Sequence, residues 1–377
     1  RRTDLLLPAP HGTGRPRTGD LMRSPRTLSF ASGGAHAAAV VLALLLVVLL
    51  AACGGEAGDQ ADGSSGGGGD AAGSDDSTPG GGGEIVLHPE NGEVVLDEPA
   101  TRIVALSWDF AEDAIALGVM PVGVADVANY DTFVGPVTGE LPDSVTDVGL
   151  RDEPSIEAIR SVEPDLILAN PDSAAPILDD LEAIAPTAMY DPYATDVPQL
   201  EQMRTIFSEV GLAVGEEELA AEVLDEVDAA IDEAGERLAE LPEEDRQVAV
   251  VQGYLAGGVP VIRMFTDDSM TMQLYEQAGL ENTWTEPGDE YGFTTTDIEG
   301  MTTVTEGSVL ITADEQDIDD AGLAENPLYD TWPPLVDGRA FSIGTDAWTF
   351  GGPLSAEKLV DLAVAALVDG EGQLAPS

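Results

Sequence analysis

The stretch RIVALSWDFAEDAIALGVMPVGVAD, residues 102–126, contains the two periodicities that decide the fold. Residues 102–106 form a short apolar run typical of a strand, residues 108–117 have helical spacing, and residues 121–125 are apolar again. Two strands joined by a helix predict a β-α-β unit with parallel strands. Since such strands are covered by helices on both faces, the stretch predicts an α/β fold.

The same alternation continues on both sides of a long helical stretch. Before it, the predicted helices and strands are residues 156–162, 165–169 and 176–185. After it, they are residues 248–252, 261–262, 270–279, 309–311, 340–343 and 355–368. The helical stretch, residues 198–212 and 216–241, repeats apolar residues at three and four. We therefore expect an N-terminal α/β lobe at 84–196, a connecting helix at 197–213 and a C-terminal α/β lobe at 214–377.

One segment of the first half recurs in the second. Residues 156–162, followed by a strand, are matched 142 residues later by residues 298–304, again followed by a strand. Apolar residues match at the first, fourth and seventh places, and Glu157 and Glu299 match at the second. One such echo segment in each half is expected of a pseudo-duplicated protein with two lobes.

The chain begins with features of a secreted lipoprotein. Residues 22–26 are basic, residues 37–52 are apolar, and Leu-Ala-Ala precedes Cys53. This order predicts a lipoprotein signal peptide at 22–52, an upstream extension at 1–21 and lipidation of Cys53, with an uncleaved transmembrane anchor as the alternative. Residues 53–83 are rich in Gly, Ser and Asp, which predicts a flexible tether.

Charge separates the leader from the rest of the chain. The 377 residues carry a formal net charge of −56, yet six of the 15 basic residues and only two of the 71 acids precede Cys53. The acids that follow are spread between apolar segments, and hydrophobic residues make up 43% of the chain, so we expect a folded body with an acidic shell. Such a shell suggests adaptation to high salt, and it argues against nucleic acid as a partner.

The sequence has few of the residues that catalytic sites and metal sites usually need. A single Cys cannot form an internal disulfide, and three His offer little to a zinc site or a Ser-His-Asp triad. Carboxylate pairs are abundant, but no spacing separates them from a solvated acidic surface. We therefore expect neither an enzyme nor a resident metal or covalent cofactor.

Four stretches, residues 102–108, 117–126, 147–157 and 348–355, resemble the substrate-binding lipoproteins of iron-siderophore ABC importers, in particular the ferric-hydroxamate type. The resemblance implies two α/β lobes joined by one long rigid helix, with a shallow ligand cleft between them. It implies a monomer, anchored by lipid to the outer face of the cell membrane. This protein would capture a ferric siderophore and deliver it to an ABC permease and its ATPase.

The resemblance also suggests residues for the ligand site. A ferric siderophore needs a cation for its chelating oxygens and aromatic walls for its organic shell. The residues that match are Arg151, Trp348, Phe350, Tyr291 and Phe133, with Arg263 as a further anion contact. The alternatives are a surface Arg151 paired with a neighbouring acid, and aromatic side chains that pack in the core.

Glu157 and Glu299 also have two possible roles. In the family that the chain resembles, one exposed Glu on each lobe pairs with arginines of the permease, which predicts a docking role for this pair. The alternative is charge stabilisation at the start of a helix.

Other functions remain open at this stage. The same fold could carry cobalamin or haem, although the scarcity of His disfavours a His-ligated haem or a metal-ion carrier. A surface lipoprotein that binds another protein is the alternative from a different class.

Overall fold

The computed structural model describes residues 84–256, 259–313, 323 and 326–376. The predicted upstream extension, signal peptide, Cys53 and tether lie outside these residues. Within the described part of the chain, no helix combines the length and apolarity that a bilayer span requires.

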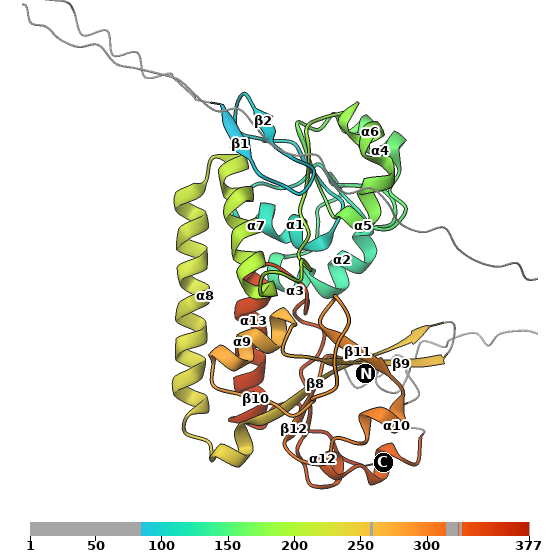
Figure 1. The fold of residues 1–377 in the computed structure, drawn as a ribbon, viewed down its shortest axis with the longest axis vertical. Coiled ribbons are helices and arrows are strands. Elements are labelled where there is room, and N and C mark those ends of the chain that lie inside the picture. Colours follow the sequence, from blue (N-terminus) through green and yellow to red (C-terminus); the bar gives the residue numbers. More distant parts are fainter. Residues whose placement is uncertain (1–83, 257–258, 314–322, 324–325, 377) are drawn as a thin grey trace, which may run out of the picture. The chain divides into compact units, whose positions relative to one another are not determined.

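The first half forms a five-stranded parallel sheet with strand order β5-β4-β3-β6-β7. A short antiparallel pair precedes it (Figure 1). The strands are β1 (Ile85–Leu87), β2 (Val94–Leu96), β3 (Ile103–Ala105), β4 (Gly123–Val124), β5 (Thr146–Asp147), β6 (Leu166–Ala169) and β7 (Thr187–Met189). The helices are α1 (Trp108–Ala116), α2 (Val127–Phe133), α3 (Gly135–Thr138), α4 (Ile156–Ser161), α5 (Pro171–Ala174), η1 (Ala175–Ile177) and α6 (Leu178–Glu182).

The second half forms a six-stranded mixed sheet with order β11-β9-β8-β12-β13, in which β10 also pairs with β8. Its strands are β8 (Gln247–Ala256), β9 (Val259–Phe265), β10 (Glu281–Asn282), β11 (Phe293–Thr296), β12 (Ser308–Ile311) and β13 (Ala340–Ser342). Its helices are η2 (Glu243–Arg246), α9 (Met270–Gln277), α10 (Ile298–Met301), η3 (Tyr329–Thr331), α12 (Pro333–Val336) and α13 (Pro353–Leu367). The α/β fold class predicted from the sequence is confirmed.

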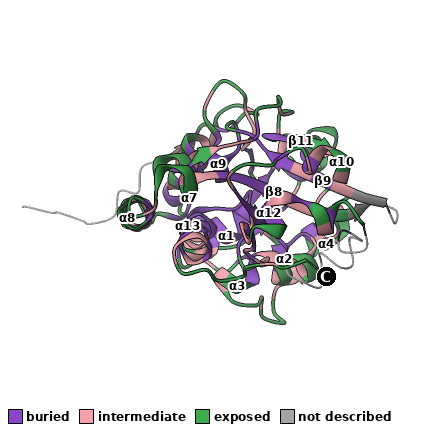
Figure 2. Cartoon of the chain, turned by 90° about the horizontal axis from the view of Figure 1, so that it is seen from below, coloured by how far each residue is buried: buried purple, intermediate pink, exposed green. Residues whose placement is uncertain are grey.

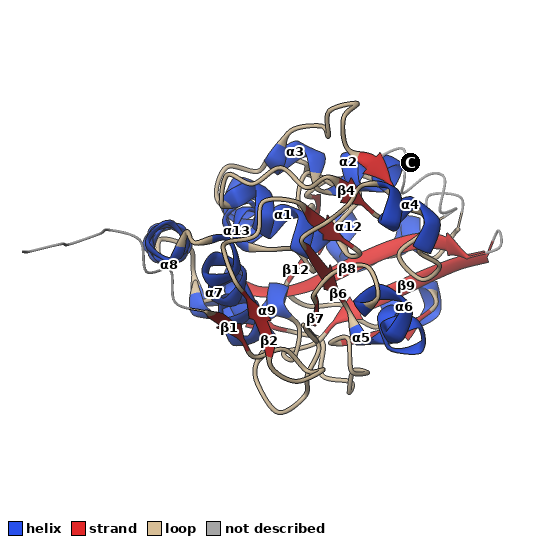
Figure 3. Ribbon diagram, turned by 90° about the horizontal axis from the view of Figure 1, so that it is seen from above, coloured by secondary structure: helices blue, strands red, loops and turns tan. Residues whose placement is uncertain are grey.

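Alternate residues of the central strands enter two separate cores. In β3, Ile103 and Ala105 pack with α1 and α7, whereas Val104 packs with α4 and α6 on the opposite face. In β12, Leu310 packs toward α8, α9 and α13, whereas Val309 packs toward α10 and α12. The strands are therefore buried on both faces, as parallel sheets require (Figures 2 and 3).

Two helices cross from one lobe to the other as an antiparallel hairpin, α7 (Gln199–Val214) and α8 (Glu217–Leu238) (Figure 1). The first turns of α7 pack in the C-terminal core, where the backbone N–H of Leu200 donates to Gln273 (2.8 Å). Its last turns pack in the N-terminal core. In α8, Ala220 and Val223 lie in the N-terminal core and the residues from Val227 onward in the C-terminal one. The helix expected at 197–213 thus coincides with α7, and α8 shares the connection between the lobes.

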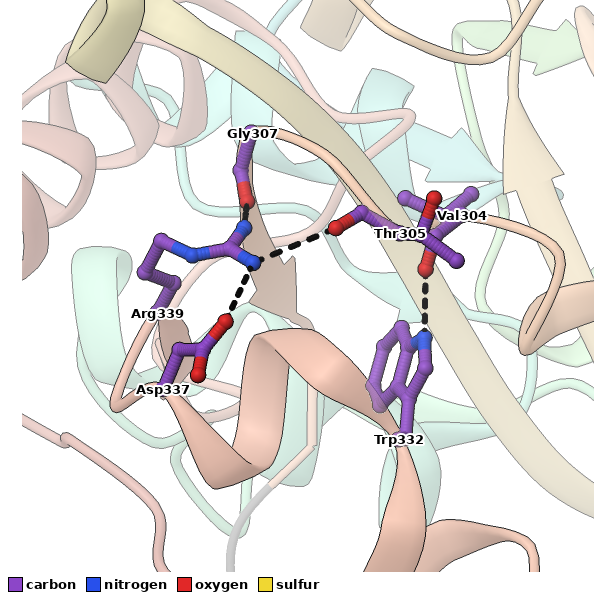
Figure 4. Close-up of polar contacts among 6 residues, drawn as sticks. All are labelled: Val304, Thr305, Gly307, Trp332, Asp337 and Arg339. Carbon is purple, nitrogen blue, oxygen red and sulfur yellow. Dashed lines mark hydrogen bonds and ion pairs between the residues drawn. The ribbon is translucent and has the colours of Figure 1, made fainter.

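The echo segments adopt the same local structure. Helix α4 is capped by Ser155, whose side chain accepts from the third residue of the helix, and α10 is capped in the same way by Asp297. In the loop after each helix, an arginine that directly precedes a strand donates to backbone carbonyl oxygens: Arg102 to those of Val162 and Glu163, and Arg339 to those of Thr305 and Gly307 (Figure 4). The two halves therefore repeat a capped helix followed by a loop whose carbonyl oxygens an arginine binds.

Candidate functional site

A cleft of about 600 Å³ lies between the lobes, at the carboxyl ends of several strands. Its volume is in the range of small-molecule sites, and its position outside the carboxyl ends of parallel strands is typical of open α/β sheets. The N-terminal lobe supplies Trp108, Asp126, Asn129, Phe133 and Arg151. The C-terminal lobe supplies Gln252, Gly253, Tyr254, Arg263, Thr312, Ala313, Thr345 and Trp348.

Arg151 is held by a tight turn that follows β5. Gly149 has φ +101°, and a Cβ at this position would lie 3.0 Å from backbone atoms of the returning chain, so the turn requires glycine. The guanidinium lies over the Trp108 ring, 3.8 Å from its centroid, and 5.8 Å from that of Trp348. No ion pair to Arg151 occurs within the described residues. Aromatic rings therefore hold this cation and leave its charge available.

Three aromatic side chains form a wall beside Arg151. Trp108 stacks with Phe133 at 5.8 Å between centroids and meets Trp348 edge-on at 5.0 Å. Phe133 and Trp348 are 5.4 Å apart. The indole N–H of Trp108 donates to the carbonyl oxygen of Ala125 (3.1 Å), which fixes the ring. The wall includes residues of both lobes, so it depends on their relative position.

Arg263, on β9, faces the cleft from the C-terminal lobe. It donates to Gln252 Oε1 (3.0 Å), and its guanidinium carbon lies 4.4 Å from the Phe293 centroid and 4.8 Å from that of Tyr254. Its Nε is buried and makes no hydrogen bond to the described residues. Since Arg263 also makes no ion pair among them, its charge favours an anionic ligand in the cleft.

The cleft differs in charge from the rest of the protein. Among the residues that line it, the two arginines are opposed by one carboxylate, that of Asp126. Asp126 accepts from the side chain of Asn129 (2.9 Å) and has a left-handed backbone, φ +56°. In a chain with a formal charge of −56, this local excess of positive charge favours an anionic ligand.

The structure brings together four of the six predicted ligand residues. Arg151, Phe133, Trp348 and Arg263 line the cleft. Phe350 lies outside it, because it is 9% exposed and packs against Phe265, Phe293 and Tyr193 in the C-terminal core. For Phe350 the alternative of core packing agrees with the structure.

Tyr291 is also not among the residues that line this cleft. Its hydroxyl donates to Asp172 Oδ2 (3.0 Å), so it links the two lobes. Trp108, Tyr254 and Asp126 were not predicted as site residues. Trp108 could have been found from its position directly after the first strand of a parallel sheet.

The two echo glutamates are exposed at corresponding helix starts, Glu157 on α4 and Glu299 on α10. Neither takes part in an ion pair within the described residues. The described residues also contain no cluster of three or more His, Cys, Asp or Glu that could hold a metal ion.

A two-lobed fold with a partly aromatic, partly cationic cleft defines a solute-binding protein. The chain belongs to the periplasmic binding protein family, whose profile matches residues 103–345. The prediction of a binding protein rather than an enzyme is confirmed.

Relatives with known ligands are similar over most of their length. The Fe(3+)-citrate-binding protein YfmC of Bacillus subtilis is 26% identical over 72% of this chain and 82% of its own. The iron(3+)-hydroxamate-binding protein FhuD of Escherichia coli is 26% identical over 69% of this chain and 84% of its own. The structure of Vibrio cholerae FhuD with Fe3+-Desferal has a TM-score of 0.62 at 26% identity, over 71% of this chain and 97% of its own. The resemblance to iron-siderophore binding proteins is thereby confirmed.

Proposed function

We propose that the protein captures a ferric siderophore outside the cell and delivers it to an ABC permease for iron uptake. The observation that carries the proposal is the pair of arginines, Arg151 and Arg263, that face one cleft from opposite lobes and make no ion pair within the described residues. The aromatic wall of Trp108, Phe133 and Trp348 suits the organic shell of such a ligand. Relatives that bind ferric citrate and ferric hydroxamate support the same function.

The charge of the cleft favours a ferric complex with net negative charge. A ferric citrate or tris-catecholate complex is anionic and would place oxygens near both guanidinium groups. A neutral or cationic hydroxamate complex would leave the charges of Arg151 and Arg263 without compensation. Among siderophore classes we therefore propose the anionic complexes as ligands.

Fluorescence titration of the purified protein in high salt tests the function. Trp108 and Trp348 line the cleft, so binding of a ferric complex should quench their emission. The panel is ferric citrate, a ferric tris-catecholate and ferrioxamine, each with its iron-free form as control. No quenching by any ferric complex would contradict the function, whereas preference for ferrioxamine would contradict only the proposed charge class.

We further propose that Glu157 and Glu299 dock the two lobes on the permease, and that lipid on Cys53 holds the protein at the membrane. Exposure of both glutamates without internal partners supports the docking role. Replacing both by Ala should reduce cellular uptake and leave ligand affinity unchanged. A matched control replaces Glu217 and Asp232, which are exposed on α8, and should leave uptake unchanged. Equal loss of uptake in both double variants would contradict docking.

The domain division is proposed as 84–196, 197–213 and 214–377. The first sheet ends at β7 and the second begins at β8, with the helical hairpin between them, which supports these limits.

A further inference from the structure

A contact between the lobes lies one helical turn behind the aromatic wall. Glu112 on α1 is fully buried, and its carboxylate accepts from the backbone N–H and from the hydroxyl of Ser355 on α13, both at 2.7 Å. The N-cap of α13 is Gly352, which has no side chain to satisfy the first N–H groups. Glu112 of the opposite lobe therefore takes the place of a capping side chain.

The carboxyl group of the neighbouring acid, Asp113, differs from that of Glu112 in its hydrogen bonding. Asp113 is 3% exposed, and its Oδ1 makes no hydrogen bond within the part of the chain that the structure describes. A Cβ added to Gly352 would lie 2.4 Å from this oxygen, so the carboxyl group lies against the backbone of the other lobe. An ionised carboxylate in this position would be buried without a donor, which is strongly unfavourable.

The groups around the pair add negative rather than positive charge. Asp109, one turn earlier on α1, raises the pKa of both Glu112 and Asp113, although burial is the larger cause for each. Tyr130 of α2 also faces the pair, and burial raises its own pKa. Arg151 acts on Asp109, where its positive charge opposes the increase in pKa that burial causes. Tyr193, in the segment between β7 and α7, also faces Asp109.

Glu112 and Asp113 differ in acid strength because they differ in the hydrogen bonds that they accept. Burial raises the pKa of Glu112 to about 7, and the hydrogen bonds from Ser355 and the backbone of Gly352 oppose this increase. Burial raises the pKa of Asp113 well above its ordinary value, and no hydrogen bond opposes it. Glu112 therefore ionises first, and Asp113 retains the proton of the pair.

The same contact reaches the cleft. The Ser355 hydroxyl, which donates to Glu112, accepts from the backbone N–H of Trp348 (3.3 Å). Trp108 lies one turn before Glu112 on α1 and meets Trp348 edge-on. A small cavity of about 20 Å³, enough for one water molecule, lies beside Asp109 and Asp113. The position of Trp348 against Trp108 thus depends on how Glu112 holds Ser355.

We propose that Glu112 and Asp113 are a positioning pair in which Glu112 accepts the hydrogen bonds that cap α13 while Asp113 keeps its proton at neutral pH, and that the pair sets the spacing of the aromatic wall. The expected effect on ligand affinity rests on the proposed function. The inference that Asp113 is protonated while Glu112 accepts the cap hydrogen bonds does not. A second negative charge at this contact would separate the lobes.

Amide substitutions distinguish the two acids. Glu112→Gln replaces one of the two acceptor oxygens with an NH₂ group that faces the donors of Ser355, so the midpoint of thermal unfolding should fall by about 4 °C or more. The same variant should weaken binding of ferric citrate about tenfold, because Trp348 loses its support. Asp113→Asn mimics the protonated acid and should leave the midpoint at pH of about 5 unchanged. Asp225→Asn, an exposed change on α8, is the control for the loss of one charge.

The pH dependence gives a second measurement. Both folded-state pKa values are raised, so the folded protein binds more protons than the unfolded chain. Stability is therefore greatest below about pH 4 for these groups and falls as the pH rises through the folded values. Between about pH 5 and about pH 9 the decrease in midpoint should be smaller in Asp113→Asn than in the wild type and the Asp225→Asn control.

Infrared spectra test protonation directly, even where Glu112→Gln does not fold. At neutral pH the wild type minus Asp113→Asn difference spectrum should contain the carbonyl band of a protonated carboxylic acid. The proposal is overturned if that band is absent, if Asp113→Asn lowers the midpoint as much as Glu112→Gln, or if its pH profile matches that of the wild type. If ferric citrate quenched tryptophan fluorescence in neither the wild type nor any variant, that result would contradict the proposed function alone.

Discussion

The cleft and the contact between the lobes lie one turn apart on α1, and they treat charge in opposite ways. In the cleft, Arg151 and Arg263 lie on aromatic rings and make no ion pair with any described residue. At the contact, Glu112 and Asp113 are buried, and no basic residue of the described ranges lies beside them. The two regions differ in the group that neutralises the charge of the side chains. In the cleft, the ligand would neutralise the arginines. At the contact, the N-terminus of α13 stabilises the Glu112 carboxylate, and a bound proton neutralises Asp113.

Arg151→Ala should give the largest effect on binding. The substitution removes the cation nearest the aromatic wall, so affinity for an anionic ferric complex should fall about 100-fold. Fluorescence titration measures the change. Arg160→Ala, an exposed position on α4, is the matched control and should bind as the wild type does. A change below about twofold in Arg151→Ala would show that the cleft is not driven by charge.

Gly352→Ala tests the other region. Its backbone is extended, at φ −87°, so alanine is allowed there, but the new Cβ would overlap Asp113 Oδ1. We expect a loss of about 2 kcal/mol in the free energy of unfolding, measured by chemical denaturation. Gly235→Ala on α8 has room, with its nearest neighbour at 3.6 Å, and should be neutral or stabilising. Equal responses at the two glycines would contradict the tight contact.

Arg263→Gln should have a smaller effect that depends on the ligand. The amide keeps polarity near Gln252 but removes the charge, so affinity for ferric citrate should fall about tenfold and affinity for ferrioxamine should change little. Parallel titrations with both complexes measure this selectivity. A similar loss for both would mean that Arg263 acts by shape rather than by charge.

Asp126→Asn should give the smallest effect, and in the opposite direction. It removes the one carboxylate that lines the cleft, and Asn tolerates the left-handed backbone at this position. Affinity for an anionic complex should rise about twofold to threefold at low salt and less at high salt. Titration at two ionic strengths measures it, and a decrease in affinity would indicate that Asp126 contacts the ligand.

The sequence predicted the parts of this arrangement that depend on local pattern. Strand and helix periodicity along residues 102–126 predicted the β-α-β unit, and the scarcity of basic residues drew attention to Arg151. The contact between Glu112 and Ser355 joins residues 243 apart, and no local pattern marks it. The sequence also could not show that Phe350 packs against Phe265 and that Tyr291 bonds to Asp172, because the direction of a loop side chain depends on packing between strands and helices.

The helical hairpin has a consequence for unfolding. Each of its helices contributes buried residues to both cores, so neither lobe can lose its core without disturbing a helix that also packs in the other core. The two lobes should therefore melt together, with a calorimetric enthalpy equal to the van't Hoff enthalpy, although each has its own sheet. A protein assembled from two similar halves would in this way behave as one cooperative unit.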